Sequence, residues 1–226
     1  MNEKMSDLEI TNVHVTKNTY ECSVTVDCAV FGFQDGVLKL LLVQKATDPF
    51  KGYWLLPGGF IKKGQTAEEA VNYVLFTLTG IQGVHQEQVQ CYTETDRHPV
   101  KRVITISHYG LIKPENHPII EDKYAGEIRW FRLDELPEMG FDHERITVDA
   151  LAKLKSNVKE RLTLGELLPV KFTMTELQYL YEALLDQKLD RRNFRKKMLQ
   201  TGLLKKSGKK KTGVQGGPDL FEFIKS

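Results

Sequence analysis

The sequence predicts a mixed α/β (α+β) protein of two parts, a large sandwich of strands and helices followed by a small module of helices and a β-hairpin. Strand-like segments flank an Asp35-Gly36 pair, which is typical of a hairpin turn. Apolar residues recur at helical spacing over residues 67–78 and from about 142 to 161. Charge also divides the chain: residues 171–226 carry 13 Lys/Arg against 6 Asp/Glu, whereas residues 1–170 carry 19 against 24. A basic module therefore follows an acidic one, which favours a polyanionic partner for the second part only.

The bulk composition indicates a soluble globular protein. Of the 226 residues, 41% are hydrophobic and 27% are charged, and no apolar run approaches the roughly 18 residues that a membrane span needs. The first residues show no secretory signal. Cys22, Cys28 and Cys91 are odd in number and lack metal-ligand spacing, which predicts buried thiols. We therefore expect a cytoplasmic protein with no membrane partner.

The first part begins with two strands, residues 20–33 and 37–45, on either side of the Asp-Gly turn. Further strands are expected within residues 84–94, 100–112 and 127–133. The helix from about Asp142 closes this part, with Asp142 able to cap its start. Residues 164–170, which include Gly165 and Pro169, form the expected connector.

The helix at 67–78 has an apolar stripe that faces a core, and Thr66 with Glu69 forms a capping box. It lies inside the segment Gly59–Ile81, GFIKKGQTAEEAVNYVLFTLTGI, which keeps the glycine and apolar spacing of the Nudix box, G-x5-E-x7-R-E-U-x-E-E-x-G-U. The segment therefore resembles a Nudix domain, an α/β/α sandwich. The box's four glutamate slots hold Gln65, Val74, Thr77 and Leu78 instead.

Those substitutions predict that hydrolysis is lost while the fold is kept. In Nudix enzymes the glutamates hold Mg²⁺, a hard cation that is bound by carboxylate oxygens and substrate phosphates. Val, Leu and Thr cannot replace them, so no metal, catalytic residue or cofactor is expected. The alternative is an active hydrolase whose acids come from outside the box, and the available ones are Glu94, Glu115, Glu121 and Glu127.

The second part reads as a winged helix-turn-helix. Thr173 and Glu176 form another capping box, Asp190 caps a helix over residues 191–201, and Gly202 ends it. A basic turn at residues 207–211 and a strand with Phe221 then complete a hairpin. Major-groove readers need Arg, Lys and Asn on the recognition helix, and a wing uses Lys to hold phosphate. The predicted DNA contacts are Arg191, Arg192, Asn193, Arg195, Lys196, Lys197, Lys209, Lys210 and Lys211. A module that binds RNA or a partner protein remains an alternative.

Nearly the whole chain resembles the NrtR-like group of Nudix-related transcriptional regulators, and among them the arabinose-responsive regulators of gut bacteria. The resemblance rests on the degenerate box, on segments such as WLLPGGF at 54–60 and DRHP at 96–99, and on GFDHERI at 140–146 and the run 172–199. It implies a sensor domain, residues 1–162, and a DNA-binding domain, residues 163–226. It further implies a homodimer on a palindromic operator.

The effector implied by the resemblance is either a sugar such as L-arabinose, controlling sugar-utilisation genes, or ADP-ribose, controlling NAD metabolism. Without carboxylates no metal anchors a diphosphate, which favours the neutral sugar, although Lys45, Arg97 and Arg102 can bind phosphate directly. The predicted effector site combines polar and aromatic side chains: Asp27, Lys45, Phe60, Tyr92, Asp96, Arg97, His98 and His108. Asp142 and His143 either cap a helix or help to transmit effector binding.

Overall fold

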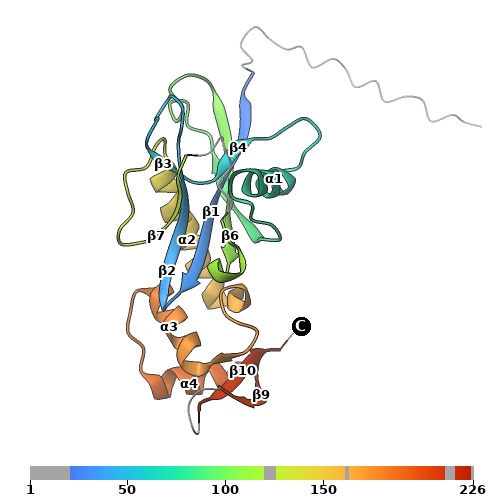
Figure 1. Ribbon diagram of the computed structural model, residues 1–226, viewed down its shortest axis with the longest axis vertical. Helices are drawn as coiled ribbons and strands as arrows, with labels where there is room; N and C mark the ends of the chain where they lie inside the picture. Colours follow the sequence, from blue (N-terminus) through green and yellow to red (C-terminus); the bar gives the residue numbers. More distant parts are fainter. Residues whose placement is uncertain (1–20, 120–125, 161–162, 212–216, 225–226) are drawn as a thin grey trace, which may run out of the picture.

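The protein consists of two lobes stacked along its long axis (Figure 1), as a computed structural model shows for residues 21–119, 126–160, 163–211 and 217–224. The predicted ends of the first strand at Tyr20 and of the helix at Arg161, the acid Glu121 and the proposed boundary after Leu162 lie outside the described residues.

The large lobe contains a seven-stranded sheet in the order β3-β2-β1-β6-β5, with β4 paired to β1 and β7 paired to β2. Its strands are β1 (Ser23–Gln34), β2 (Val37–Gln44), β3 (Trp54–Leu55), β4 (Gly58–Phe60), β5 (His85–Tyr92), β6 (Val103–Ile112) and β7 (Ile128–Arg132). β1 runs parallel to β6, whereas the other pairs within the sheet are antiparallel. The predicted turn between β1 and β2 is confirmed, because Asp35 and Gly36 both have positive φ.

Two helices cover opposite faces of this sheet, which confirms the predicted α/β/α sandwich. α1 (Ala67–Thr79) packs on the face formed by Val26, Cys28 and Val30, and α2 (His143–Glu160) packs on the face formed by Ala29 and Phe31. The short 3₁₀ helix η1 (Pro114–Asn116) follows β6. The capping box of Thr66 and Glu69 is present, and Gly80 ends α1 in the left-handed conformation.

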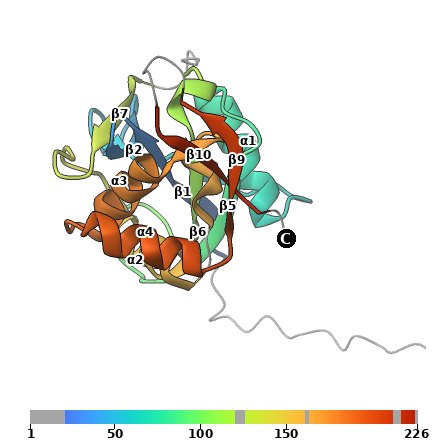
Figure 2. The same cartoon turned by 90° about the horizontal axis from the view of Figure 1, so that it is seen from below.

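The small lobe has the predicted winged helix-turn-helix order. It contains the 3₁₀ helix η2 (Thr163–Glu166), then β8 (Phe172–Thr173), α3 (Met174–Leu185), α4 (Arg191–Gln200), β9 (Leu204–Lys210) and β10 (Asp219–Phe223). Seen from below, α3, α4 and the β9–β10 pair lie in front of the large lobe (Figure 2). The predicted basic turn is wrong in part, because residues 207–210 belong to strand β9, where Gly208 has a φ of +71°.

One hydrophobic cluster runs through both lobes. Leu154 of α2 and Leu164 of η2 are fully buried in the same cluster as Leu177 and Leu180 of α3 and Phe221 of β10. The two lobes are therefore joined by a shared core around the C-terminal half of α2.

Two expectations from composition have different outcomes. No helix of the described residues is both long and apolar enough to cross a membrane. The prediction of three buried thiols is wrong for Cys22 and Cys91, which are exposed, whereas Cys28 is buried. Burial raises the pKa of the Cys28 thiol, so this cysteine remains protonated.

Candidate functional site

A cavity of about 210 Å³ opens where β1, β4 and β6 meet the start of α2. Two threonines on neighbouring strands form part of its polar wall. Thr25 of β1 and Thr105 of β6 are register partners, and their hydroxyls lie 2.6 Å apart. Five of the predicted effector residues line this cavity, namely Asp27, Lys45, Phe60, Arg97 and His98. The polar and aromatic lining residues outside the predicted effector group are Thr25, Thr105, Phe141 and His143, of which only His143 was named, as a residue that caps a helix or transmits effector binding.

Asp27 is a buried carboxylate in the cavity wall. Burial raises its pKa, while His143, Arg97 and a hydrogen bond with Thr105 act in the opposite direction. The strand β4 passes very close to it, because a Cβ on Gly58 would lie 1.9 Å from the Asp27 Oδ1 atom. Glycine at position 58 therefore lets this carboxylate lie against the backbone of β4.

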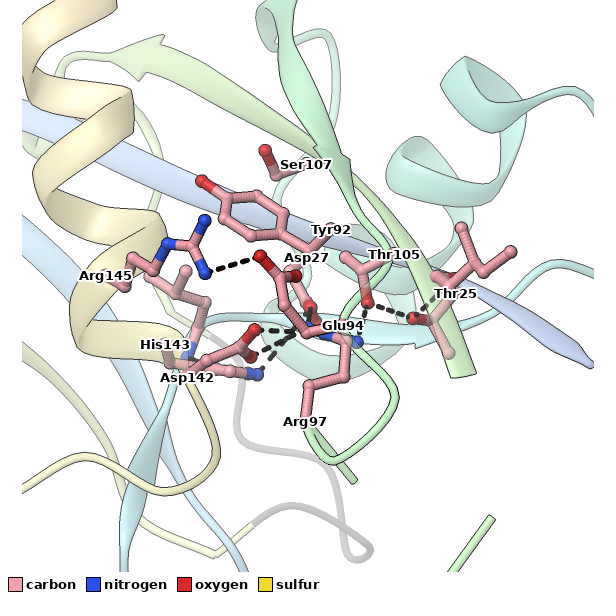
Figure 3. A network of polar contacts seen from close by, with 12 residues as sticks. Thr25, Asp27, Tyr92, Glu94, Arg97, Thr105, Ser107, Asp142, His143 and Arg145 are labelled. Carbon is pink, nitrogen blue, oxygen red and sulfur yellow. Dashed lines mark hydrogen bonds and ion pairs between the residues drawn. The ribbon is translucent and has the colours of Figure 1, made fainter. Parts of the chain in front are cut away.

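Arg97 connects the cavity to the first residues of α2 (Figure 3). Its Nε and Nη2 atoms donate to the two carboxylate oxygens of Asp142 at 2.9 and 2.7 Å, and Nη1 donates to the Thr105 hydroxyl. Its side chain is only 6% exposed, and Asp27 Oδ2 lies 4.0 Å from Nη2. The guanidinium is thus held by a bidentate pair with Asp142 and by weaker contacts to Thr105 and Asp27.

His143, the first residue of α2, joins the same network. Its Nδ1 atom accepts a hydrogen bond from the Leu56 backbone N–H at 2.9 Å, which leaves Nε2 as the ring nitrogen that carries a proton. That nitrogen faces the Asp27 carboxylate at 3.6 Å. The ring therefore holds β3–β4, β1 and α2 together at the cavity.

Phe141 forms the corner before α2 and has a φ of +56°, a left-handed conformation that non-glycine residues rarely adopt. Its ring stacks on His98 with centroids 5.2 Å apart and contacts Phe50 at 4.6 Å. Neighbouring Gly140 is tightly enclosed, because a Cβ there would lie 2.9 Å from Leu55. This packing fixes the corner against the cavity.

The mouth of the cavity is aromatic and cationic. Phe60 is 49% exposed, and the Lys101 ammonium lies 4.1 Å from the centre of its ring. Desolvation and the nearby charges of Lys101, Arg97 and Lys45 lower the pKa of His98. His98 is therefore neutral at pH 7, and the fixed positive charges at the mouth come from lysine and arginine.

Three predicted effector residues do not line the cavity. Tyr92 is buried and donates to Asp149 of α2 at 2.8 Å, and desolvation raises its pKa to about 12. Asp96 is exposed on the loop after β5. His108 lies on the opposite face of β6 from Thr105, near Glu68 of α1, where burial lowers its pKa. Side chains alternate along a strand, so a group drawn from both faces of β6 cannot share one cavity.

The slots that hold glutamates in a Nudix box have other contacts here. Gln65 Oε1 accepts from the Lys62 backbone N–H at 2.9 Å, Val74 is buried beneath Gly59, and Thr77 is exposed. Leu78 lines a second cavity of about 180 Å³. Among the described residues, no group of three or more His, Cys, Asp or Glu is placed to hold a metal ion. The residues in these slots thus do not fit Mg²⁺.

The acids proposed for an alternative hydrolytic site are dispersed. Glu94 pairs with Arg145 at 2.7 Å, and Glu127 pairs with Arg129. Glu115 is exposed on η1. These carboxylates lie on different elements, and none belongs to the cavity lining.

The exposed face of α4 has the properties of a nucleic-acid interface. Phe194 and Met198 bury one side of the helix, and Asp190 caps it by accepting from the Asn193 backbone N–H at 2.9 Å. Every predicted contact on α4 is exposed. Within the described residues none of the following cations forms an ion pair: Arg191, Arg192, Lys196, Lys197, Lys209 and Lys210.

Two other predicted DNA contacts have partners within the protein. Lys211 pairs with Glu176 of α3 at 2.7 Å, and the Arg195 guanidinium lies 5.4 Å from the centre of the Phe221 ring. Lys205 and Lys206 of β9, which were not predicted, are exposed but pair with Glu222 and Asp219.

Comparisons with known proteins identify the family. The model of the NUDIX domain matches residues 23–151, more than half of the chain. The chain belongs to the NUDIX domain family. A second model, the NrtR DNA-binding winged helix domain, matches residues 164–223 of this NUDIX protein.

Individual relatives share both domains. The "ADPR responsive transcriptional repressor NtrR" of Acinetobacter baylyi is 29% identical over 204 residues, which cover 88% of this chain and 81% of the relative. The structure of Shewanella oneidensis NrtR complexed with a 27mer DNA has a TM-score of 0.75 at 28% identity, and the match covers 89% of this chain and 93% of that one. The NUDIX domain of the Shewanella protein complexed with ADP ribose has a TM-score of 0.56 at 27% identity, over 66% of this chain and 99% of that domain.

This NUDIX-family protein is therefore a DNA-binding regulator of the NrtR type, with a NUDIX effector domain and a winged helix domain.

Proposed function

We propose that ADP-ribose, or a nucleotide sugar closely related to it, is the effector, and that it binds at the Asp27–Arg97 cavity without being hydrolysed. The residues alone favoured a neutral sugar such as arabinose, whereas the named ligands of the relatives point to ADP-ribose. The Acinetobacter repressor is named as ADPR-responsive, and the Shewanella NUDIX domain was solved with ADP ribose. The comparisons thus support the alternative that the sequence analysis left open.

The observation that carries this proposal is the buried guanidinium of Arg97 in a cavity whose mouth carries further cations. An arginine shielded from water binds a phosphate or a sugar hydroxyl much more strongly than one on the surface. Lys45 lines the cavity, and Lys101 lies over the exposed ring of Phe60. ADP-ribose could place its diphosphate near Lys45 and Lys101 and stack its base on the Phe60 ring, and would then contact all three side chains.

The size of the cavity is consistent with a site that encloses only part of ADP-ribose. Sites for drug-sized ligands typically measure about 300–1,000 Å³, whereas this cavity measures about 210 Å³. A ligand as large as ADP-ribose would therefore extend through the mouth and cover Phe60. A free pentose would fit inside and leave the exposed part of the Phe60 ring uncovered.

Phe60→Ala tests this difference, and Tyr73→Ala is a matched control. Both rings are exposed and carry a lysine ammonium, Lys101 or Lys62, within 4.1 Å of the ring centre, but Tyr73 lies on α1 outside the cavity. Isothermal titration calorimetry should show ADP-ribose binding that Phe60→Ala weakens about 5-fold or more, since stacking a base on an aromatic ring contributes about 1–3 kcal/mol. Binding of L-arabinose but not ADP-ribose by the wild type would restore the sugar hypothesis.

The loss of hydrolysis is a separate part of the proposal, and the four substituted box positions support it. With Mg²⁺ present, the purified protein should leave ADP-ribose intact while it binds the compound. Release of AMP at enzyme-like rates, followed by chromatography, would contradict this part and favour the hydrolase alternative.

We further propose that a homodimer binds a palindromic operator through α4 and β9. The free cations on α4 and at Lys209 and Lys210 support this assignment, because exposed, unpaired Lys and Arg neutralise phosphates and read base edges. Two-fold symmetric proteins place their recognition helices on half-sites about one helical turn apart, or a multiple of it.

DNA selected from a random pool by the wild-type protein provides the operator for a binding test. Replacing Arg191, Arg192 and Lys196 with Ala should abolish the shift of this DNA in a gel. A charge-matched control replaces three exposed lysines of the other domain, Lys51, Lys62 and Lys63. If both triple variants lose equal affinity, the effect is one of net charge and α4 is not the recognition helix. If the wild-type protein selects no DNA but does select ligands from a random RNA pool, the RNA-binding alternative is favoured.

A further inference from the structure

Three consecutive residues at the start of α2 face the proposed effector cavity or its buried arginine. Phe141 and His143 line the cavity, and Asp142 between them binds the Arg97 guanidinium with both carboxylate oxygens. The start of this helix is thus attached to the cavity wall by packing, by a hydrogen bond to β3–β4 and by a bidentate ion pair (Figure 3).

The Asp142 carboxylate could form hydrogen bonds other than those it makes to Arg97. Its backbone carbonyl accepts from the Ile146 N–H at 3.1 Å, so Asp142 occupies the N-cap position of α2. Aspartate side chains are strongly preferred there because they accept hydrogen bonds from the unpaired N–H groups of the first turn. In this structure, Arg97 takes both carboxylate oxygens instead. Asp142 therefore has two mutually exclusive partners, Arg97 and the first turn of its own helix.

Arg97 is the group on which an effector can act. It lines the cavity, whereas Asp142 does not. Three of its five N–H groups are used by Asp142 and Thr105, and the other two can donate to acceptor oxygens of an effector. An anionic effector bound to them would draw the guanidinium toward the cavity and away from Asp142.

The other end of α2 reaches the DNA-binding domain. The helix has 18 residues, which corresponds to about 27 Å. Leu154 shares a buried cluster with Leu164 and with Leu180 of α3. Leu151 and Lys155 line a cavity of about 350 Å³ together with Ala183 of α3. Because Leu154, Leu164 and Leu180 pack in one cluster, a displacement of α2 is transmitted to α3 through direct contact.

We propose that Arg97 is the positioning residue that couples the two domains: an effector that binds Arg97 releases Asp142 to cap α2, and the altered start of α2 changes its placement against α3. This inference rests on the proposed effector site, but not on the identity of the effector. The two partners of Asp142, Arg97 and the first turn of α2, define two discrete arrangements, which an allosteric transition requires.

Asp142→Asn provides the test, with Arg97→Lys as a second variant. Asparagine cannot form the charged pair but still caps a helix, so it should mimic the effector-bound arrangement. Lysine at position 97 keeps the charge but lacks the planar fork that binds both carboxylate oxygens. Arg145→Gln is the control, since Arg145 also joins α2 to the β5–β6 loop, through Glu94, but its side chain is 54% exposed and does not line the cavity.

Affinity for the selected operator is measured by fluorescence anisotropy with and without ADP-ribose, after thermal melting has shown that each variant is folded. Without effector, Asp142→Asn and Arg97→Lys should differ from the wild type by about 5-fold or more, the lower end of typical allosteric coupling. The change should go in the direction in which ADP-ribose moves the wild type, and Arg145→Gln should behave as the wild type. Asp142→Asn should still bind ADP-ribose, but the compound should no longer alter its operator affinity.

Wild-type operator affinity and a full ADP-ribose response in Asp142→Asn would overturn the inference, as would an equal effect of Arg145→Gln. If ADP-ribose does not act on the wild type, the proposed effector is wrong. The comparison of the three variants without effector then still decides whether the Arg97–Asp142 pair sets operator affinity.

Discussion

Asp27 is a carboxylate in a place where its charge is unfavourable, which is common at sites that bind ligands. It is only 6% exposed, and burial is the largest influence on its pKa, which is raised. A raised pKa means that the folded state favours the protonated acid, so the ionised form destabilises the fold at neutral pH. Arg97 and His143 offset part of this cost.

Asp27→Asn is therefore expected to raise the melting temperature at pH 7, because the amide avoids the desolvation of a charge. Calorimetry over a pH series provides the measurement. Since Asp27 becomes protonated as the pH falls through its raised pKa, the advantage of the variant should shrink under acid conditions. A lower melting temperature at pH 7 would show that the Arg97 and His143 contacts outweigh burial. ADP-ribose binding should weaken in the same variant.

Gly58→Ala is expected to destabilise the protein by about 1–3 kcal/mol, the usual range for overpacking, because its Cβ would lie 1.9 Å from Asp27 Oδ1. The free energy of unfolding in urea measures this effect. Gly165→Ala is the matched control, since its Cβ would meet Phe223 at an ordinary 3.5 Å. Equal stability of the two variants would mean that β4 and Asp27 can move apart at little cost.

At the scale of elements, the sequence predicted helices well and the faces of strands poorly. The capping boxes at Thr66 and Thr173 marked the starts of α1 and α3 correctly, because capping depends on residues three apart in the chain. The strands β3, β4 and β8 were too short to give an alternating pattern. Their existence depends on pairing with distant partners.

The effector site was predicted only in part, because its residues are also brought together by distant parts of the chain. Asp27, Lys45, Phe60, Arg97 and His98 were placed in one group by the resemblance, and they do line one cavity. His108 was misplaced because it lies on the opposite face of β6 from Thr105, and Tyr92 was misplaced because its hydroxyl is directed to Asp149 of α2. Phe141 and His143 reach the cavity only through tertiary packing, which no local pattern reveals.

For the β9–β10 hairpin, we predict that a lysine without an ion pair contributes more to the salt dependence of DNA binding than a lysine that already forms one. Lys209→Ala should reduce the slope of log affinity against log salt by about one, because a free lysine releases one counterion when it binds a phosphate. Lys206→Ala should reduce it less, since Lys206 pairs with Asp219 at 2.8 Å. Anisotropy titrations at several salt concentrations give both slopes, and a larger effect of Lys206→Ala would reverse the assignment.

At the scale of the whole molecule, the core that both lobes share has a thermodynamic consequence. Leu154, Leu164 and Leu180 lie in one cluster that spans the junction, so melting of the winged helix domain would expose the end of α2. We therefore predict a single cooperative transition in differential scanning calorimetry, with matching calorimetric and van't Hoff enthalpies. Two resolved transitions would show that the lobes unfold independently.

The packing between α1 and β4 limits which side chain position 74 can hold. A Cβ on Gly59 would lie 2.9 Å from the Val74 Cγ2 atom, so the side chain at position 74 already fills the space beneath β4. A glutamate there would enter a site that is 7% exposed, and an unpaired buried charge is strongly unfavourable. A glutamate at position 74 would therefore require β4 and α1 to separate and admit water and a cation.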